Sequence, residues 1–303
     1  MKRKIFGELM KKRISRITWF FVTCFLLLTQ PVECWLDGGH MLVAQVAYNH
    51  LDPEVKERVD VLSEAFAFFY PEHQSFITSS TWMDYVRCKG GLYIFDTWHY
   101  VDIPYDPEGV LTPEQKEKLL IENETHSVIE GIQQAKKTLR GSRASTFEKA
   151  LMLRVLIHCV GDIHTPLHTT SRYTPELLNG DRGGNGFKLK GEHKNLHVLW
   201  DTGFGEWTDI EMLPVTEELL QFIKDYAKDL EASYPADGFP FLHVLDPKAW
   251  AREGHTIAVE EAYSLPEGQA PSKEYLIEGR ETARQRIVLA GYRLAILLNE
   301  IFK

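Results

Sequence analysis

The sequence predicts an all-α protein built as a single domain, and three observations support this prediction. Helical patterns dominate the chain, evidence for β-strands is slight, and no internal repeat or low-complexity block interrupts the 303 residues. The composition, with 44% hydrophobic and 25% charged residues, is that of an ordinary globular protein. A disordered, collagenous or disulfide-dense chain is therefore excluded.

Residues 1–34 have the pattern of a secretory signal peptide. A basic stretch that ends at Arg16 is followed by an apolar run over residues 17–28. Val32 and Cys34 then stand at the −3 and −1 positions of a cleavage site. The apolar run is short for a membrane span, which favours a cleaved signal over the alternative of an uncleaved N-terminal anchor.

Cleavage between Cys34 and Trp35 would release residues 35–303 as the mature domain, secreted to an extracellular or periplasmic location. A signal that starts at Met10 has more usual proportions than one that starts at Met1, so both starts stay open. No later stretch is long and apolar enough to span a membrane, and we expect no stable membrane association.

The predicted helices follow in order along the mature chain. Pro53 opens a helix that runs to about Phe69, and the Thr112-Pro113-Glu114-Gln115 signature opens a long helix to about Arg140. Residues 147–164 carry apolar side chains at helical spacing. Further helices are expected near residues 214–232, 246–261 and 271–301.

One long loop, from Thr169 to Lys194, stands out between these helices. It contains five glycines, at positions 180, 183, 184, 186 and 191. A loop of this length inside a compact helical domain is usually functional.

The formal net charge of −9 hides an asymmetry. Residues 1–34 hold seven basic and two acidic residues, which leaves 27 basic and 41 acidic residues, a net charge of −14, for the mature domain. Such an acidic body is a poor electrostatic match for nucleic acid or an anionic membrane unless it binds cations.

Histidine and aspartate residues occur in patterns that suit a metal site. His158 and Asp162 lie at i and i+4 of one predicted helix, so both side chains project from the same face. His197 and Asp201 repeat this spacing, and His168 lies between the two pairs. Imidazole and carboxylate are the ligand set of zinc and similar ions. A single pair of this kind is more often a surface hydrogen bond, so the order and spacing of the whole set must decide.

Six motifs carry these residues in a fixed order: Trp35-x4-His40-Met41, Trp82-x-Asp84-x-x-Arg87, His99-x-x-Asp102, His158-x3-Asp162-Ile163-His164-x-Pro166-Leu167-His168, Gly183-Gly184-Asn185 and Asn195-Leu196-His197-x-x-Trp200-Asp201. Together they span more than half of the mature chain. They resemble the motifs of the zinc-dependent single-strand nuclease family, which includes fungal nucleases and plant bifunctional nucleases. This family belongs to the zinc phospholipase C/nuclease superfamily, and the resemblance implies its compact helical fold.

The resemblance implies three zinc ions (Zn²⁺) per chain. The nine implied ligands form three groups: Asp84, His99 and His158; Trp35, His40 and Asp162, which bridges to the first group; and His168, His197 and Asp201. Trp35 would bind through its α-amine and carbonyl, which requires cleavage before this residue. The signal pattern and the resemblance therefore point to the same bond.

The resemblance also implies roles beyond the metals, with a zinc-bound hydroxide attacking phosphorus. Asp84 would orient or deprotonate the nucleophile, Arg87 would neutralise phosphoryl charge, Tyr100 and Asp102 would bind a nucleobase, and Asn185 would reach the phosphate. Plainer interpretations exist for three of them: a surface salt bridge, ordinary packing and turn formation for Arg87, Tyr100 and Asn185, respectively.

Other polar residues receive separate interpretations. His164 points away from the ligand face and is expected to make buried hydrogen bonds. Cys88 is one turn beyond Asp84 and Cys159 adjoins His158, and because those neighbours would share a zinc, a Cys88–Cys159 disulfide is a hypothesis. Asn123-Glu124-Thr125 is an N-glycosylation sequon.

The sequence therefore predicts a secreted zinc-dependent endonuclease that hydrolyses single-stranded DNA and RNA to 5′-mononucleotides, with 3′-nucleotidase activity as a further expectation. Its partners would be nucleic acid and nucleotides, and the sequence indicates no protein partner. The nearest alternative is a zinc phospholipase C, but a choline-type headgroup needs neither Asp102 nor the Gly183-Gly184-Asn185 loop. A second alternative is a zinc-binding protein without catalysis, which intact Asp84 and Arg87 disfavour.

Overall fold

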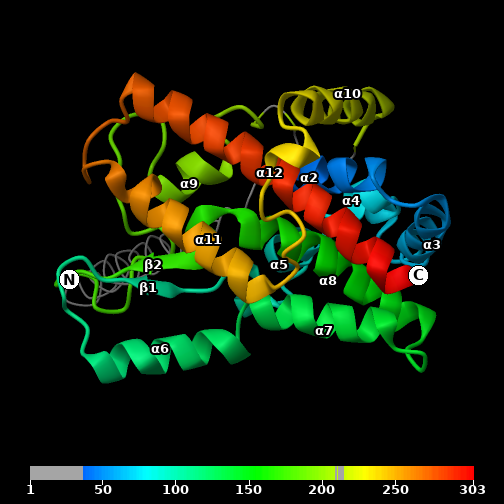
Figure 1. Ribbon diagram of the computed structural model, residues 1–303, viewed down its shortest axis with the longest axis horizontal. Helices are drawn as coiled ribbons and strands as arrows, with labels where there is room; N and C mark the ends of the chain where they lie inside the picture. The colour runs from blue at the N-terminus through cyan, green and yellow to red at the C-terminus, as the bar shows by residue number, and fades with distance from the viewer. Residues whose placement is uncertain (1–36, 209, 211–214) are drawn as a thin grey trace, which may run out of the picture. The chain divides into compact units, whose positions relative to one another are not determined.

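Helices make up most of the computed structural model, which describes residues 37–208, 210 and 215–303 (Figure 1). The leader, its cleavage site and Trp35 lie outside the described residues. The α-helices are α2 (Asp37–Asn49), α3 (Pro53–Glu64), α4 (Phe76–Ser79), α5 (Trp82–Cys88), α6 (Pro113–Thr125), α7 (Val128–Arg140), α8 (Thr146–His164), α9 (Leu196–Asp201), α10 (Glu217–Ser233), α11 (Pro247–Glu260) and α12 (Lys273–Phe302). Five short 3₁₀ helices are η1 (Pro71–His73), η2 (Asp96–His99), η3 (Pro166–Thr169), η4 (Ala236–Gly238) and η5 (Ala262–Ser264). The all-α prediction is confirmed.

Helix α8 is the central element of the fold. It begins at a capping box formed by Ser145 and Glu148 and ends at His164, two residues before Pro166. Every residue from 153 to 164 is buried, because α2, α3, α5, α7, α11 and α12 all pack against this helix. A helix that is surrounded in this way gives its side chains fixed positions.

Helix α2, the first described helix, packs against α12, the last one (Figure 1). The two backbones approach closely at Gly291, where an added Cβ atom would lie 2.5 Å from Val46 Cβ. Residues 37–47 of α2 are all buried as a result. The N-terminal part of the described chain is thus fixed by its C-terminal helix.

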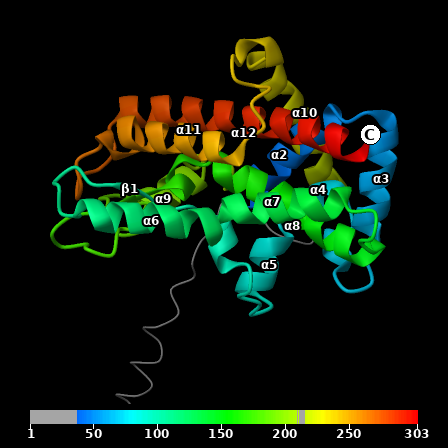
Figure 2. The same ribbon diagram turned by 60° about the horizontal axis from the view of Figure 1, so that its bottom comes forward.

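The predicted long helix from residue 112 to Arg140 is wrong, because the chain breaks between α6 and α7 (Figure 2). Ser127 has an extended backbone, and its hydroxyl accepts a hydrogen bond from the Ile129 N–H group at 3.3 Å, so it caps α7. The predicted helix from Pro53 is also shorter than expected and ends at Glu64.

A small parallel sheet includes the first part of the predicted loop. Strand β1 (Ile103–Tyr105) pairs with β2 (Thr170–Arg172), with Ile103 opposite Thr170 and Tyr105 opposite Arg172. The loop from Thr169 to Lys194 therefore has structure of its own, since it contains β2 and an isolated bridge between Thr174 and Leu177, and a second bridge joins Lys188 to Asn195 just after it.

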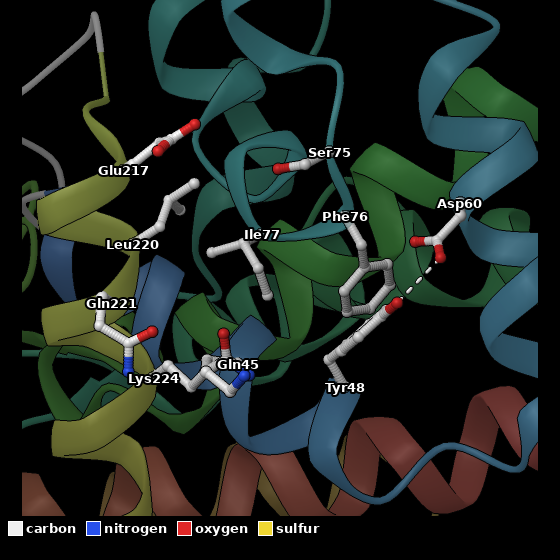
Figure 3. Close-up of a pocket in the computed structure, with 10 residues that line it drawn as sticks. All are labelled: Gln45, Tyr48, Asp60, Ser75, Phe76, Ile77, Glu217, Leu220, Gln221 and Lys224. Atoms are coloured by element: carbon white, nitrogen blue, oxygen red, sulfur yellow. Dashed lines mark hydrogen bonds between the residues drawn. The ribbon is translucent and has the colours of Figure 1, made fainter.

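A pocket of about 340 Å³ lies between α2, α3, α4 and the first turns of α10 (Figure 3). Tyr48, Phe76 and Lys224 are among its lining residues, and none of the predicted site residues lines it. In the described part of the chain, no helix is long and apolar enough to cross a membrane.

Candidate metal centre

The structure brings eight of the nine predicted ligands together in three buried groups. The groups are His40 with His158 and Asp162, Asp84 with His99 and His158, and His168 with His197 and Asp201. Within each group, one ligand atom of every residue lies within 4.8 Å of the others. The ninth predicted ligand, Trp35, lies outside the described residues. Each group could hold a metal ion.

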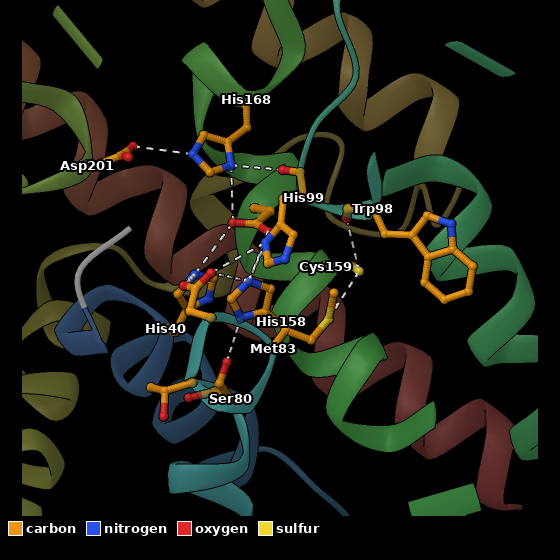
Figure 4. A network of polar contacts seen from close by, with 12 residues as sticks. His40, Ser80, Met83, Trp98, His99, His158, Cys159, His168 and Asp201 are labelled. Carbon is orange, nitrogen blue, oxygen red and sulfur yellow. Dashed lines mark hydrogen bonds and ion pairs between the residues drawn. The ribbon is translucent and has the colours of Figure 1, made fainter. Parts of the chain in front are cut away.

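Four imidazole rings, those of His40, His99, His158 and His168, come together in Figure 4. The carboxylate of Asp162 contacts all four of them. One of its carboxylate oxygens is 3.1 Å from His158 Nε2 and 3.2 Å from His99 Nδ1. The other oxygen is 3.1 Å from His168 Nδ1 and 3.5 Å from His40 Nε2. A single carboxylate from α8 therefore joins side chains from α2, η2 and η3.

Backbone carbonyl groups orient three of the imidazole rings. His158 Nδ1 donates to the Ser80 carbonyl at 2.7 Å, His197 Nδ1 donates to the Gly183 carbonyl at 2.7 Å, and His168 Nδ1 is 3.0 Å from the His99 carbonyl. Because a carbonyl oxygen can only accept, Nδ1 carries the donated hydrogen in each of these rings, and Nε2 is the atom that would bind a metal. Metal-binding histidines in proteins are usually held in this way.

The third group has buried polar atoms that the protein leaves unsatisfied. Asp201 lies 2.9 Å from His197 Nε2 and 3.4 Å from His168 Nε2. Neither oxygen of Asp201 has a partner in hydrogen-bond geometry among the described residues. Since buried carboxylates are costly without compensation, this donor set suits a borderline divalent cation such as zinc.

The carboxylates make the site strongly favourable for positive charge. Burial acts to lower the pKa of His158, but Asp162 and Asp84 outweigh it and raise that pKa to about 9. Burial likewise acts to raise the pKa of Asp162, yet His158 and His168 hold it well below its usual range. By contrast, burial lowers the pKa of His40 and that of His99 to about 4. The site therefore stabilises cationic charge beside neutral rings.

Gly161 is a site residue that sequence reasoning missed. A Cβ atom at this position would lie 2.7 Å from His40 Nδ1. The His40 ring stacks on the His158 ring with a centroid separation of 4.0 Å and is fully buried. An isolated glycine inside an apolar helix, next to Asp162, was the available signal for such a close approach.

The predicted catalytic and nucleobase residues lie next to the metal groups along the chain. Arg87 Nε is 3.2 Å from Asp96 Oδ1. Burial has the largest influence on the pKa of His99 and on that of Tyr100, and the Arg87 charge acts to lower both pKa values. Tyr100 directly follows His99 and has 37% of its surface exposed. Burial, followed by the nearby Asp181, raises the pKa of Asp102 to about 6.

The loop residue Asn185 has its side-chain amide engaged within the loop, where Nδ2 donates to the Arg182 carbonyl at 2.8 Å. Arg182 itself was missed by sequence reasoning. It is exposed, adopts a left-handed backbone with φ of 57°, and its N–H group donates to Ser171 Oγ at 3.1 Å. Burial raises the pKa of Asp102 and that of Tyr100, and the Arg182 charge acts to lower both. Only the folded loop places this cation beside the predicted nucleobase residues.

His164 lies outside the three groups and makes buried hydrogen bonds. Its Nδ1 donates to the Val160 carbonyl at 2.8 Å, and its Nε2 is 3.0 Å from Arg293 Nη1. Glu253 balances the Arg293 charge at 2.7 Å. This network lies behind the end of α8 that carries Asp162.

The hypothesis of a Cys88–Cys159 disulfide is wrong. Neither residue, both within the described part of the chain, forms a disulfide. Cys159 is one residue after His158 and therefore points about 100° away from the ligand face. Its thiol donates to the Trp98 carbonyl at 3.3 Å, whereas Cys88 is exposed.

Comparison with known proteins identifies the family. A family model described as S1/P1 Nuclease matches residues 35–303. The chain is 26% identical to Endonuclease 2 of Arabidopsis thaliana over 306 residues, which covers 94% of this chain and 97% of the relative. It is 23% identical to Nuclease P1 of Penicillium citrinum over 288 residues (88% and 97%) and 28% identical to Nuclease S1 of Aspergillus oryzae over 164 residues (49% and 53%). The chain therefore belongs to the S1/P1 nuclease family and is a hydrolase that acts on phosphodiester bonds of nucleic acid.

Proposed function

We propose that the protein is a secreted zinc nuclease that hydrolyses single-stranded DNA and RNA to 5′-mononucleotides and also acts as a 3′-nucleotidase. The observation that carries this proposal is that three buried histidine–aspartate groups lie together and that Asp162 contacts a histidine of each. The acidic composition of the chain also supports the proposal, because some of its carboxylates would serve as metal ligands. Metal cations would reverse the sign of the charge where a phosphate binds.

Three zinc ions would be held by the three groups. Trp35 would complete the His40 and Asp162 group through its α-amine and carbonyl, and Asp162 would be shared with the group of Asp84, His99 and His158. When bound, zinc polarises phosphoryl oxygens and lowers the pKa of a coordinated water toward about 7. Imidazole and carboxylate donors with Nε2 lone pairs turned toward the site support zinc over harder cations.

Two residues would act on the reacting phosphate directly. Asp84 is buried beside His99 and His158, with one oxygen 3.5 Å from His99 Nδ1, and would orient or deprotonate the attacking water. Arg87 lies one turn further along α5 and would neutralise charge on the phosphoryl oxygens. Its ion pair with Asp96 fixes the guanidinium near the group of His99.

The nucleobase would bind at Tyr100 and Asp102. The exposed tyrosine ring offers a stacking surface worth about 1–3 kcal/mol per base. The Asp102 carboxyl would hydrogen-bond to the edge of the base, and Asn185 in the neighbouring loop would contact the phosphate. Because a duplex hides the faces of its bases, such a pocket favours single strands.

Secretion follows from the leader. The family match begins at residue 35, which is the residue predicted to follow the cleaved signal. A mature chain that starts with Trp35 would have the free α-amine that the second zinc group requires.

The test is to incubate the purified mature protein with single-stranded DNA, RNA, duplex DNA and phosphatidylcholine, and to measure bound metals per chain. We expect three zinc ions, preferential cleavage of the single strands, and 5′-phosphorylated products. Turnover of phosphatidylcholine without cleavage of DNA would replace the proposal with a phospholipase C. Zinc binding without any turnover would leave a zinc-binding protein that has lost catalysis.

A further inference from the structure

The segment from Tyr100 to Asp102 is held by hydrogen bonds from two directions. On one side, the Val101 N–H group donates to the His168 carbonyl at 2.8 Å, which ties the segment to the metal centre. On the other side, the Val128 N–H group donates to the Tyr100 carbonyl at 3.0 Å. The Asn123 side chain donates from Nδ2 to the Asp102 carbonyl at 2.7 Å.

The break between α6 and α7 makes the second set of contacts possible. An uninterrupted helix would use the Val128 N–H group for its own hydrogen bonding, whereas at the start of α7 this group is available to Tyr100. Ser127 donates from its hydroxyl to the Asn123 carbonyl, so the cap of α7 also fixes the residue that reaches Asp102. Among these contacts to the segment, only the one from Asn123 is made by a side chain.

We propose that Asn123 is a positioning residue for the nucleobase pocket. Its amide fixes the Asp102 carbonyl and thereby the direction in which the Asp102 carboxyl leaves the backbone. This inference rests on the proposed function, because it assumes that Tyr100 and Asp102 receive a base. An asparagine serves here because its amide donates a hydrogen bond, whereas an aspartate of equal size would turn a carboxylate toward a carbonyl oxygen.

The same residue begins the sequon Asn123-Glu124-Thr125, and a glycan would be attached at Nδ2. That atom lies 2.7 Å from the Asp102 carbonyl, and Asn123 is half-buried. The amide that would carry a glycan therefore already makes a hydrogen bond inside the protein. Thr125 is not involved, because its hydroxyl donates to the Glu122 carbonyl at 3.3 Å and contacts His126 Nδ1.

The experiment compares Asn123→Asp and Asn123→Ala with Thr125→Ala, all made in a host that does not glycosylate. Thr125→Ala removes the sequon but keeps the amide, so it is the matched control. KM and kcat are measured on two substrates. The first is a dinucleotide, and the second is the same dinucleotide without the base on the nucleotide whose 3′ oxygen is the leaving group. We expect both Asn123 variants to raise KM about fivefold for the dinucleotide, the effect of losing one hydrogen bond. KM for the abasic substrate and bound metal per chain should stay at the wild-type values, as should all properties of Thr125→Ala.

Three outcomes would overturn the inference. KM could be unchanged in both Asn123 variants, it could rise equally for both substrates, or it could rise in Asn123→Asp alone, which would indicate charge repulsion instead of a lost donor. Failure of the proposed function is separate, since it would show as an inactive wild-type protein. In that case amide hydrogen exchange decides: Val101 should exchange about fivefold faster in both Asn123 variants than in Thr125→Ala. Equal rates would overturn the inference.

Discussion

The close approach of α2 and α8 at Gly161 leads to a quantitative prediction for Gly161→Ala. The new Cβ atom would lie 2.7 Å from His40 Nδ1, whereas ordinary van der Waals contact begins at 3.4 Å. The ring must therefore move by about 0.7 Å to restore ordinary contact. It has little room to do so, because it is fully buried and stacked on His158.

The expected effect on stability is small, but the effect on the site is large. Overpacking costs about 1–3 kcal/mol, while alanine gains about 1 kcal/mol over glycine inside a helix, so the free energy of unfolding should fall by no more than about 2 kcal/mol. Metal and catalytic sites tolerate displacements of only about 0.5 Å, and a misplacement near 1 Å costs about a hundredfold in rate. We expect kcat/KM to fall about a hundredfold and one zinc ion per chain to be lost.

The assay combines metal content by mass spectrometry, kcat/KM on single-stranded DNA, and thermal unfolding followed by circular dichroism in the presence of a chelator. Gly238→Ala is the control, since a methyl group there would meet nothing within 4 Å. That variant should match the wild type in all three measurements. Full zinc content and full rate in Gly161→Ala would refute the reasoning that His40 needs the space of a missing side chain.

Three further predictions address other parts of the molecule. Asp162→Asn should reduce metal content in two groups at once, because its carboxylate contacts His40, His99, His158 and His168; a loss confined to one ion would contradict the shared role. One additional residue before Trp35 should lower zinc content below three ions and abolish most activity, and a fully active protein would exclude the α-amine ligand. Glu253→Gln should cost about 3 kcal/mol of unfolding free energy at pH 7, because Arg293 is left buried without its charge partner. Burial acts to raise the pKa of Glu253, but Arg293 outweighs it and holds that pKa below its ordinary 4.5. The stabilisation is therefore present above pH 4.5 and is lost as the pH falls through the folded pKa. The difference in unfolding free energy between wild type and Glu253→Gln, measured with urea, should be smaller near pH 4.

Local spacing made part of the candidate site predictable. His158 and Asp162 lie one turn apart, and helix geometry alone brings them to the same face. His197 and Asp201 follow the same rule. Relations of this kind depend on a few neighbouring residues, so the sequence contains what is needed to predict them.

Features that depend on contacts between distant segments were not predictable in this way. The break before Ser127 interrupts a helical pattern. It leaves the Val128 N–H group available to donate to the Tyr100 carbonyl, which is far away in sequence. The need for Gly161 arises only when α2 lies against α8. The pairing of Ile103 with Thr170 joins two strands of three residues each, which are too short to leave an alternating pattern.

The packing of α2 against α12 also affects how the protein is made. A chain emerges from the ribosome with its N-terminus first, so α2 is synthesised long before the helix that fixes it. Part of the packing that holds α2 and His40 is therefore missing until residues 273–302 have been added, although every candidate ligand has been translated once residue 201 is reached. We expect a chain that stops before residue 273 to contain all of these ligands but to leave exposed the side of α2 that α12 covers.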